Sequence, residues 1–203
     1  PGNSSKKKLQ FLTFLTSIIL GVSKYETLLK WSAMNYTNEE RLGGNEAPPA
    51  IISLFIGKAV RDILENIKTA DNFDDLPELY LTTNLSKIPT IKLDHSDRNR
   101  TAPFAYTGNK FEFRMPGSSF SVSEIVTTIN TVIYNGLREV KLLLEKNLKK
   151  ETDIQKVVFK TIKDVLTNHD NILFEGDCYD ESWSVEAKKR GISVTSDYFS
   201  VLE

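Results

Sequence analysis

The chain has 203 residues, 40% of them hydrophobic, and its 26 basic and 27 acidic side chains leave a net charge of −1. This length and apolar content suffice for a buried core and for one domain or two small ones. The near-zero net charge excludes a general attraction for nucleic acid or an anionic membrane. The single cysteine, Cys178, excludes an internal disulfide framework and favours a reducing compartment, so we expect a cytoplasmic protein.

The N-terminal stretch is apolar. Lys6–Lys8 and the following LQFLTFLTSIILGV have the basic head and apolar run of a signal peptide or anchor. However, the run of about 14 residues is too short to span a bilayer. It continues with helical spacing through SKYETLLKW, without a pattern of small residues typical of a cleavage site. We therefore favour a buried core helix, with Trp31 packed near its end, over a signal or anchor.

A loop rich in glycine and proline follows at Asn35–Pro49. Gly43 and Gly44 permit backbone conformations that other residues rarely adopt, and Arg41 and Glu46 flank them. Such a loop is usually no more than a polar surface loop. The functional alternative is a lid that brings a cation and a base to a substrate.

The remaining elements are predicted to be mostly helical. Pro48-Pro49 is predicted to open a helix with an apolar stripe from Ile52 to Ile67. Asp71–Thr90 is predicted to be a loop with a short strand at LYLTT. Three further helices are predicted at SVSEIVTTINTVIYNGLREVKLLLEKN with a capping box of Ser121 and Glu124, at Asp153–Asn168, and at ESWSVEAKKRG up to Gly191, with NILFEGDCY extended. His95, His169 and Cys178 lack the partner spacing of a zinc site.

The segment Asp97–Ser119 carries most of the chemistry. Phe111, Phe113 and Met115 alternate with Lys110, Glu112 and Arg114, which predicts a strand with one apolar face and one charged face. The charged residues would lie roughly 6–7 Å apart. The charged face is either a solvated outer face or, with Arg98 and Arg100 just upstream, an anion-plus-metal site.

Two blocks of sequence together resemble type III glutamine synthetase: RLGGNEAPPAIIS at Arg41–Ser53 and DRNRTAPFAYTGNKFEFRMPGSS at Asp97–Ser119. The preceding QFLTFLTSIILGVSKYETLLKWS is also similar to that family. The resemblance implies an α+β fold with helices packed on a curved antiparallel sheet, part of a catalytic barrel. It implies that 1–203 is a fragment of one catalytic domain, in which 1–148 match well and 149–203 form a weaker-matching helical part.

The resemblance also implies an activity. Glutamine synthetases use ATP and two divalent cations, Mg²⁺ or Mn²⁺, to join glutamate and ammonium through a γ-glutamyl phosphate. Glu46 matches the flap glutamate that helps deprotonate ammonium, and Arg41 matches an arginine that holds the glutamate carboxylate. Arg100 matches an arginine that stabilises the transferred phosphoryl group and contacts nucleotide.

Three strand residues complete the implied site. Glu112 matches a metal ligand, Arg114 an arginine near the phosphate and substrate, and Lys110 a basic position close to the nucleotide phosphates. Guanidinium groups and metal carboxylates are the parts that phosphoryl transfer needs. The family forms large homo-oligomeric rings, so we expect glutamate, ammonium, ATP and further copies of the chain as partners, but neither nucleic acid nor membrane.

The sequence departs from the family pattern at several positions. Glu40 stands where the family usually has histidine, and Phe120 and Ser123–Ile125 replace the usual segment after GSS. The family's other metal-ligating glutamates and its ligand histidine match nothing in the chain. The alternative is therefore a non-catalytic homologue with a structural or regulatory role. The joint presence of Arg41, Glu46 and the charged strand argues against it, because a scaffold has no need of buried charges.

Overall fold

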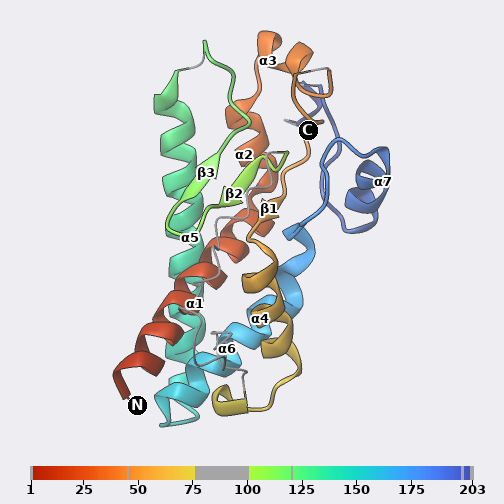
Figure 1. Ribbon diagram of the computed structural model, residues 1–203. Coiled ribbons are helices and arrows are strands. Elements are labelled where there is room, and N and C mark those ends of the chain that lie inside the picture. Colours follow the sequence, from red (N-terminus) through yellow and green to blue (C-terminus); the bar gives the residue numbers. More distant parts are fainter. Residues whose placement is uncertain (1, 45, 76–100, 120, 198, 202–203) are drawn as a thin grey trace, which may run out of the picture.

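The computed structural model describes residues 2–44, 46–75, 101–119, 121–197 and 199–201 (Figure 1). Most of these residues are helical, with a small mixed sheet, so the prediction of an α+β protein is confirmed. The elements are α1 Gly2–Lys24, α2 Glu26–Ala33, α3 Tyr36–Arg41, β1 Leu54–Phe55, α4 Lys58–Thr69, η1 Phe73–Asp75, β2 Phe104–Tyr106, β3 Phe111–Phe113, α5 Val122–Leu148, α6 Ile154–His169, η2 Asp170–Ile172, α7 Glu181–Lys189 and η3 Phe199–Val201.

The N-terminal apolar stretch forms two helices rather than one. Tyr25 leaves the helical region with φ −122° and ψ 28°, and α1 and α2 meet at a bend of 73°. The prediction of a buried core helix is confirmed, because Leu15, Ile19 and Val22 are at most 2% exposed. Within the described residues no single helix has the length and hydropathy of a membrane span, although α1 from Leu9 and α2 together would have them as a bent pair.

Helices α1 and α5 lie against each other along the left side of Figure 1. Two glycines make their close approach possible. A Cβ atom on Gly136 would lie 2.1 Å from the carbonyl oxygen of Ser17, and one on Gly21 would lie 2.6 Å from that of Val132. Because real Cβ atoms do not approach backbone oxygens so closely, the two helix backbones can touch only where both positions lack a side chain.

The sheet has three short strands in the order β1-β2-β3. Strands β2 and β3 form an antiparallel hairpin around Gly108, whose φ is +94°, and Ala105 lies opposite Glu112. Strand β1 pairs with β2 in parallel, so the sheet is mixed. The expected antiparallel arrangement therefore holds for the β2–β3 pair, while the pairing of β1 differs from it.

The prediction of a helix that opens at Pro48-Pro49 is wrong for the residues before Lys58. Residues 51–56 contain no helix and include β1, and α4 begins only at Lys58, after Gly57 with a φ of +80°. All six of these residues are buried. A run without an exposed position suits a strand covered on both faces, whereas a helix at the edge of a core would turn one side toward water.

The other helices agree with the sequence, with differences at their ends. In α5, Ser121 is the N-cap and accepts from the backbone N–H of Ser123, which is not the bond of the predicted capping box. Helix α7 ends before Gly191, which has a φ of +76°, as predicted. The predicted extended piece is present where Leu173 bridges Leu54, but it follows the 3-10 turn η2. The strand at LYLTT and His95 lie outside the described residues.

Hydrogen bonds made by two buried charged side chains of α2, Lys30 and Glu26, fix the C-terminal segment on this helix. The Lys30 ammonium is fully buried and donates to the side-chain oxygen of Ser193 at 2.9 Å, to its carbonyl, and to the carbonyl of Thr195 at 3.2 Å. One turn earlier, the Glu26 carboxylate accepts from the backbone N–H of Ser193 at 3.0 Å. Burial lowers the pKa of Lys30 to about 8, against the opposing effect of Glu26.

This lysine predicts a pH dependence of stability. Since the folded pKa of about 8 lies below the unfolded value of 10.5, the unfolded chain holds the proton in that interval and the folded chain does not. The free energy of unfolding should therefore rise with pH through this window, by up to about 3 kcal/mol. Denaturant unfolding of the wild type and Lys30→Met across the window measures this difference, with Lys141→Met as an exposed-lysine control. Parallel curves for wild type and Lys30→Met would contradict it.

Candidate active site

A small cavity of about 110 Å³ brings together three of the six residues predicted to form the site. Arg41 reaches it from the end of α3, Glu46 from the loop that follows, and Arg114 from the residue after β3. The rest of its wall comes from neighbouring loop residues and one residue near α7: Leu42, Ala47, Pro48, Pro49, Thr101, Ala102, Pro103, Met115 and Tyr179. The two halves of the predicted site, far apart in sequence, therefore share one cavity.

Asn38 and Arg41 join α3 to the end of the charged strand. Asn35 caps α3 by accepting from the Asn38 backbone N–H at 2.8 Å. The buried Asn38 side chain donates to the Met115 carbonyl at 3.0 Å and accepts from Nε of Arg41 at 2.8 Å. Arg41 also donates through Nη2 to the Met115 carbonyl. This network sets the position of the Arg41 guanidinium relative to the segment that carries Arg114.

The loop after α3 is a tight turn. Gly43 has a φ of +84°, which favours glycine, and its N–H lies 3.1 Å from the carbonyl oxygens of both Ala47 and Pro48. Leu42 and Ala47 form an isolated bridge, and Glu46, next to Ala47, is exposed. The turn thus brings the exposed Glu46 to the cavity that Arg41 and Arg114 also line. Whether the loop closes as a lid stays a prediction.

The charged strand has the predicted alternation. Phe111 and Phe113 both pack on the ring of Phe104 with centroids 5.6 Å apart, and Met115 is buried. On the other face, Glu112 pairs with Lys110 at 3.1 Å and with Nη2 of Arg114 at 2.9 Å. Hydrogen bonds from Arg114 and then Lys110 hold the pKa of Glu112 below its usual value. Glu112 is therefore ionised at neutral pH, as a metal ligand must be.

The other three predicted site residues are not among the described residues that line the cavity. Lys110, with its side chain 63% exposed, and Glu112 do not line it, and Arg100 lies outside the described residues. Among the residues that the structure describes, no three His, Cys, Asp or Glu side chains lie close enough together to hold a metal ion. On its own, Glu112 supplies one carboxylate, and both of its oxygens are paired with cations.

Sequence reasoning missed Tyr179. This tyrosine lies between α6 and α7, more than sixty positions after Arg114, yet lines the same cavity. The backbone N–H of its neighbour Cys178 donates to the Thr101 hydroxyl at 3.0 Å. This hydrogen bond joins the segment before α7 to the segment before β2. No local motif signals this contact, because it depends on where the C-terminal helices pack.

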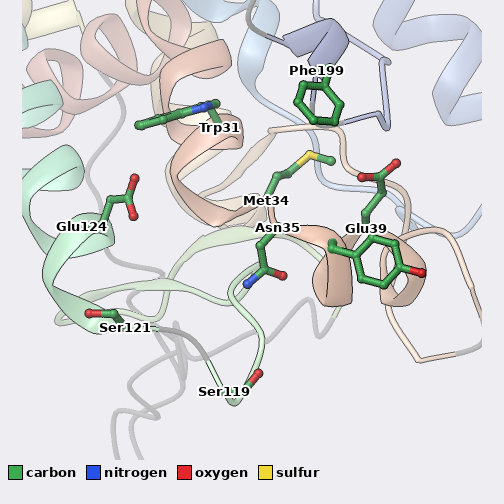
Figure 2. A pocket seen from close by; sticks show the side chains of 9 residues that line it. Trp31, Met34, Asn35, Glu39, Ser119, Ser121, Glu124 and Phe199 are labelled. Carbon is green, nitrogen blue, oxygen red and sulfur yellow. The ribbon is translucent and has the colours of Figure 1, made fainter.

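A second, larger hollow of about 540 Å³ lies apart from the predicted residues (Figure 2). Its lining includes the rings of Trp31 and Phe199, and Figure 2 shows the carboxylates of Glu39 and Glu124 on opposite sides. Trp31 and Met34 come from α2 and the residue after it, and Glu124 from the first turn of α5. None of the predicted site residues lines this hollow.

The charges of the small cavity define what it can bind. Two guanidinium groups line it, and their planar forks of donors match a carboxylate or a phosphate. Nε and Nη2 of Arg41 already donate to Asn38 and Met115, and those of Arg114 donate to Glu112, so a bound anion would pair with other donors of these groups or replace the present partners. An exposed carboxylate nearby can accept a proton from a bound cation such as ammonium. The arrangement thus suits an anionic substrate and an attacking amine, and it suits a neutral or apolar ligand poorly.

Comparison with known proteins points to one family. Residues 157–203 match the family model of the glutamine synthetase C-terminal domain. The chain is 40% identical over 196 residues to a protein of Bacteroides fragilis (strain YCH46) named glutamine synthetase, which covers 95% of the chain and 27% of that relative. It is 38% identical over 193 residues to the type-3 glutamine synthetase of Dictyostelium discoideum, covering 95% of the chain and 26% of the relative.

The chain is also 33% identical over 204 residues to a protein of Butyrivibrio fibrisolvens named glutamine synthetase. This match covers 95% of the chain and 27% of the relative. The chain thus spans about a quarter of the length of the curated relatives it matches. The similarity extends over 95% of the chain. The chain is therefore similar over nearly its whole length to proteins named glutamine synthetase, and residues 157–203 match the C-terminal domain of that family.

Proposed function

We propose that the chain is part of an ATP-dependent glutamate–ammonia ligase that forms glutamine through a γ-glutamyl phosphate. The observation that carries the proposal is the shared cavity of Arg41, Glu46 and Arg114. These side chains come from two separate sequence blocks, and the fold brings them together around a space suited to an anion. The names of the relatives agree with a ligase role.

The proposed reaction has two steps. A carboxylate oxygen of glutamate attacks the γ-phosphorus of ATP, and ADP leaves with the electrons of the broken P–O bond. Ammonia then attacks the acyl carbon of the phosphorylated carboxylate, and inorganic phosphate leaves. Both steps build up negative charge on transferred or leaving oxygens, and fixed guanidinium groups stabilise such charge.

The cavity residues have separate roles in this proposal. Arg41, fixed by Asn38 and the Met115 carbonyl, holds the glutamate carboxylate. Arg114 and Arg100 neutralise the phosphoryl oxygens. The exposed Glu46 accepts the proton that ammonium must lose before its nitrogen becomes a nucleophile.

The cofactors in the proposal are ATP with Mg²⁺ or Mn²⁺. Lys110 lies near the nucleotide phosphates, and Glu112 contributes one oxygen ligand in exchange for its present cation partners. A divalent ion of this kind takes several oxygen ligands, so the others must come from outside the residues that the structure describes. The metal would neutralise phosphate charge. In this proposal, the complete enzyme is cytoplasmic and forms a ring of identical subunits. Its catalytic barrel has a curved antiparallel sheet, and β2 and β3 are part of that sheet.

The first test concerns activity and chain length. The purified 203-residue chain should form no glutamine from glutamate, ammonium, ATP and Mg²⁺ or Mn²⁺, because one carboxylate cannot hold two cations beside ATP. The complete protein that contains it should form glutamine, measured together with release of one phosphate per glutamine. Glutamine formation by the 203-residue chain would contradict the proposal that this chain holds only part of the active site. A complete protein that folds but forms no glutamine would favour the alternative of a non-catalytic homologue.

A further inference from the structure

The C-terminal domain reaches the cavity through one short segment, residues 174–180. Cys178 is 2% exposed, contacts Ser53 through its sulfur at 3.7 Å, and donates its N–H to Thr101 at 3.0 Å. Thr101 and Tyr179 both line the cavity. The segment is thus attached to the cavity wall at the residue directly before Tyr179.

The same segment is held on its other side. Trp183 in α7 is 1% exposed, and its ring stacks on that of Phe174 with centroids 3.7 Å apart. The Asp177 side chain accepts from the Tyr179 N–H at 3.0 Å. The buried Cys178 on one side and the buried Trp183 four residues on thus fix the backbone that carries Tyr179 at the cavity, while its side chain is 45% exposed.

The size of the cavity limits what Tyr179 can do there. The cavity is small, with a volume of about 110 Å³, and Arg41, Arg114 and Tyr179 all line it. A carboxylate that enters this space and pairs with Arg41 or Arg114 therefore comes within reach of the other lining groups. A phenol is a good donor to a carboxylate, and its ring can cover the methylene groups behind that carboxylate.

We propose that Tyr179 is a substrate-binding residue whose hydroxyl donates a hydrogen bond to the substrate carboxylate that Arg41 holds. The C-terminal domain then supplies part of the site and is more than support for the catalytic residues. This inference rests on the proposed ligase function, and it specifies the substrate as an amino dicarboxylic acid with apolar methylene groups next to the bound carboxylate.

The test is Tyr179→Phe in the complete protein, which keeps the ring and removes the hydroxyl. The KM for glutamate should rise about tenfold or more, because a hydrogen bond to a charged group is lost. The kcat and the KM values for ATP and ammonium should stay within about twofold, as expected for lost uniform binding of one substrate. Tyr134→Phe, at an exposed tyrosine of α5, is the matched control and should leave all constants unchanged.

The possible outcomes separate the two proposals. An active wild type with an unchanged glutamate KM in Tyr179→Phe overturns the role of Tyr179 and leaves the ligase function standing. A lower melting temperature together with raised KM values for all three substrates shows a structural role and also overturns it. A complete wild-type protein that forms no glutamine and binds no glutamate by calorimetry overturns the ligase function, and the role of Tyr179 with it.

Discussion

Replacing Glu46 by glutamine in the complete protein is expected to lower kcat by a factor on the order of 10²–10⁴ while leaving ATP affinity nearly unchanged. The change keeps the size and polarity of the side chain but removes its negative charge, and with it the capacity to take a proton from ammonium. Glu46 is exposed and lies in the turn closed by Gly43 and Ala47. Its proposed work follows nucleotide binding, so the affinity for ATP should not depend on it.

Steady-state kinetics and direct nucleotide titration of the same variant separate the two effects. Glu40→Gln serves as the control, because Glu40 is an exposed carboxylate on α3 that does not line the cavity. The rate deficit of Glu46→Gln should shrink as pH rises toward the pKa of ammonium, since free ammonia then needs no base. A near-normal kcat in Glu46→Gln at neutral pH would contradict the role of Glu46 as a base and remove the main reason for regarding the Arg41–Pro49 loop as a catalytic lid.

Local pattern was enough to predict the elements with one exposed face. The alternation around Glu112 predicted β3, and helical spacing predicted α5, α6 and α7. In each case the solvent side and the core side carry different residue types, so the period can be read from the chain. The bend at Tyr25 could not be predicted in this way, because both helices that flank it are apolar on the side that faces the core.

The incorrect prediction of a helix at 51–56 also results from the lack of a contrast between exposed and buried positions. Where all side chains are buried, the sequence holds no period that distinguishes strand from helix, and the arrangement depends on what covers each face. Here β1 has a neighbour at each edge, because it pairs with β2 in parallel and Leu54 also bridges Leu173. Both partners are distant in sequence, and a parallel neighbour gives no local turn signal.

For the candidate site, too, the local features could be predicted from the sequence, whereas the contacts between distant segments could not. The types and spacing of Lys110, Glu112 and Arg114 could be read from one strand, and the two blocks pointed to one family. That Arg41 meets the end of this strand depends on Asn38 and the Met115 carbonyl. That Tyr179 joins them depends on how α7 packs through Trp183. Such contacts between distant segments have no signature in a single sequence.

Glu112→Gln tests the metal role of the charged strand. In the structure, Glu112 forms ion pairs with both Lys110 and Arg114, and their hydrogen bonds keep its pKa low. If it is also a metal ligand, the variant should lose on the order of 100-fold or more in apparent Mn²⁺ affinity, at least as much as removal of an outer-shell partner costs. ATP affinity measured with the metal should fall in parallel, whereas ATP affinity without metal should not.

A purely structural ion pair predicts a different set of results. An exposed or half-exposed pair contributes about 0–1 kcal/mol, so the variant would then change stability slightly and metal affinity not at all. Mn²⁺ titration followed by electron paramagnetic resonance distinguishes the two cases, with Glu145→Gln as a control because Glu145 forms an exposed pair with Lys141 on α5. Unchanged Mn²⁺ affinity in Glu112→Gln would mean that the carboxylate only holds Arg114 in place beside the cavity. Arg114→Lys should then reproduce the kinetic effects of Glu112→Gln.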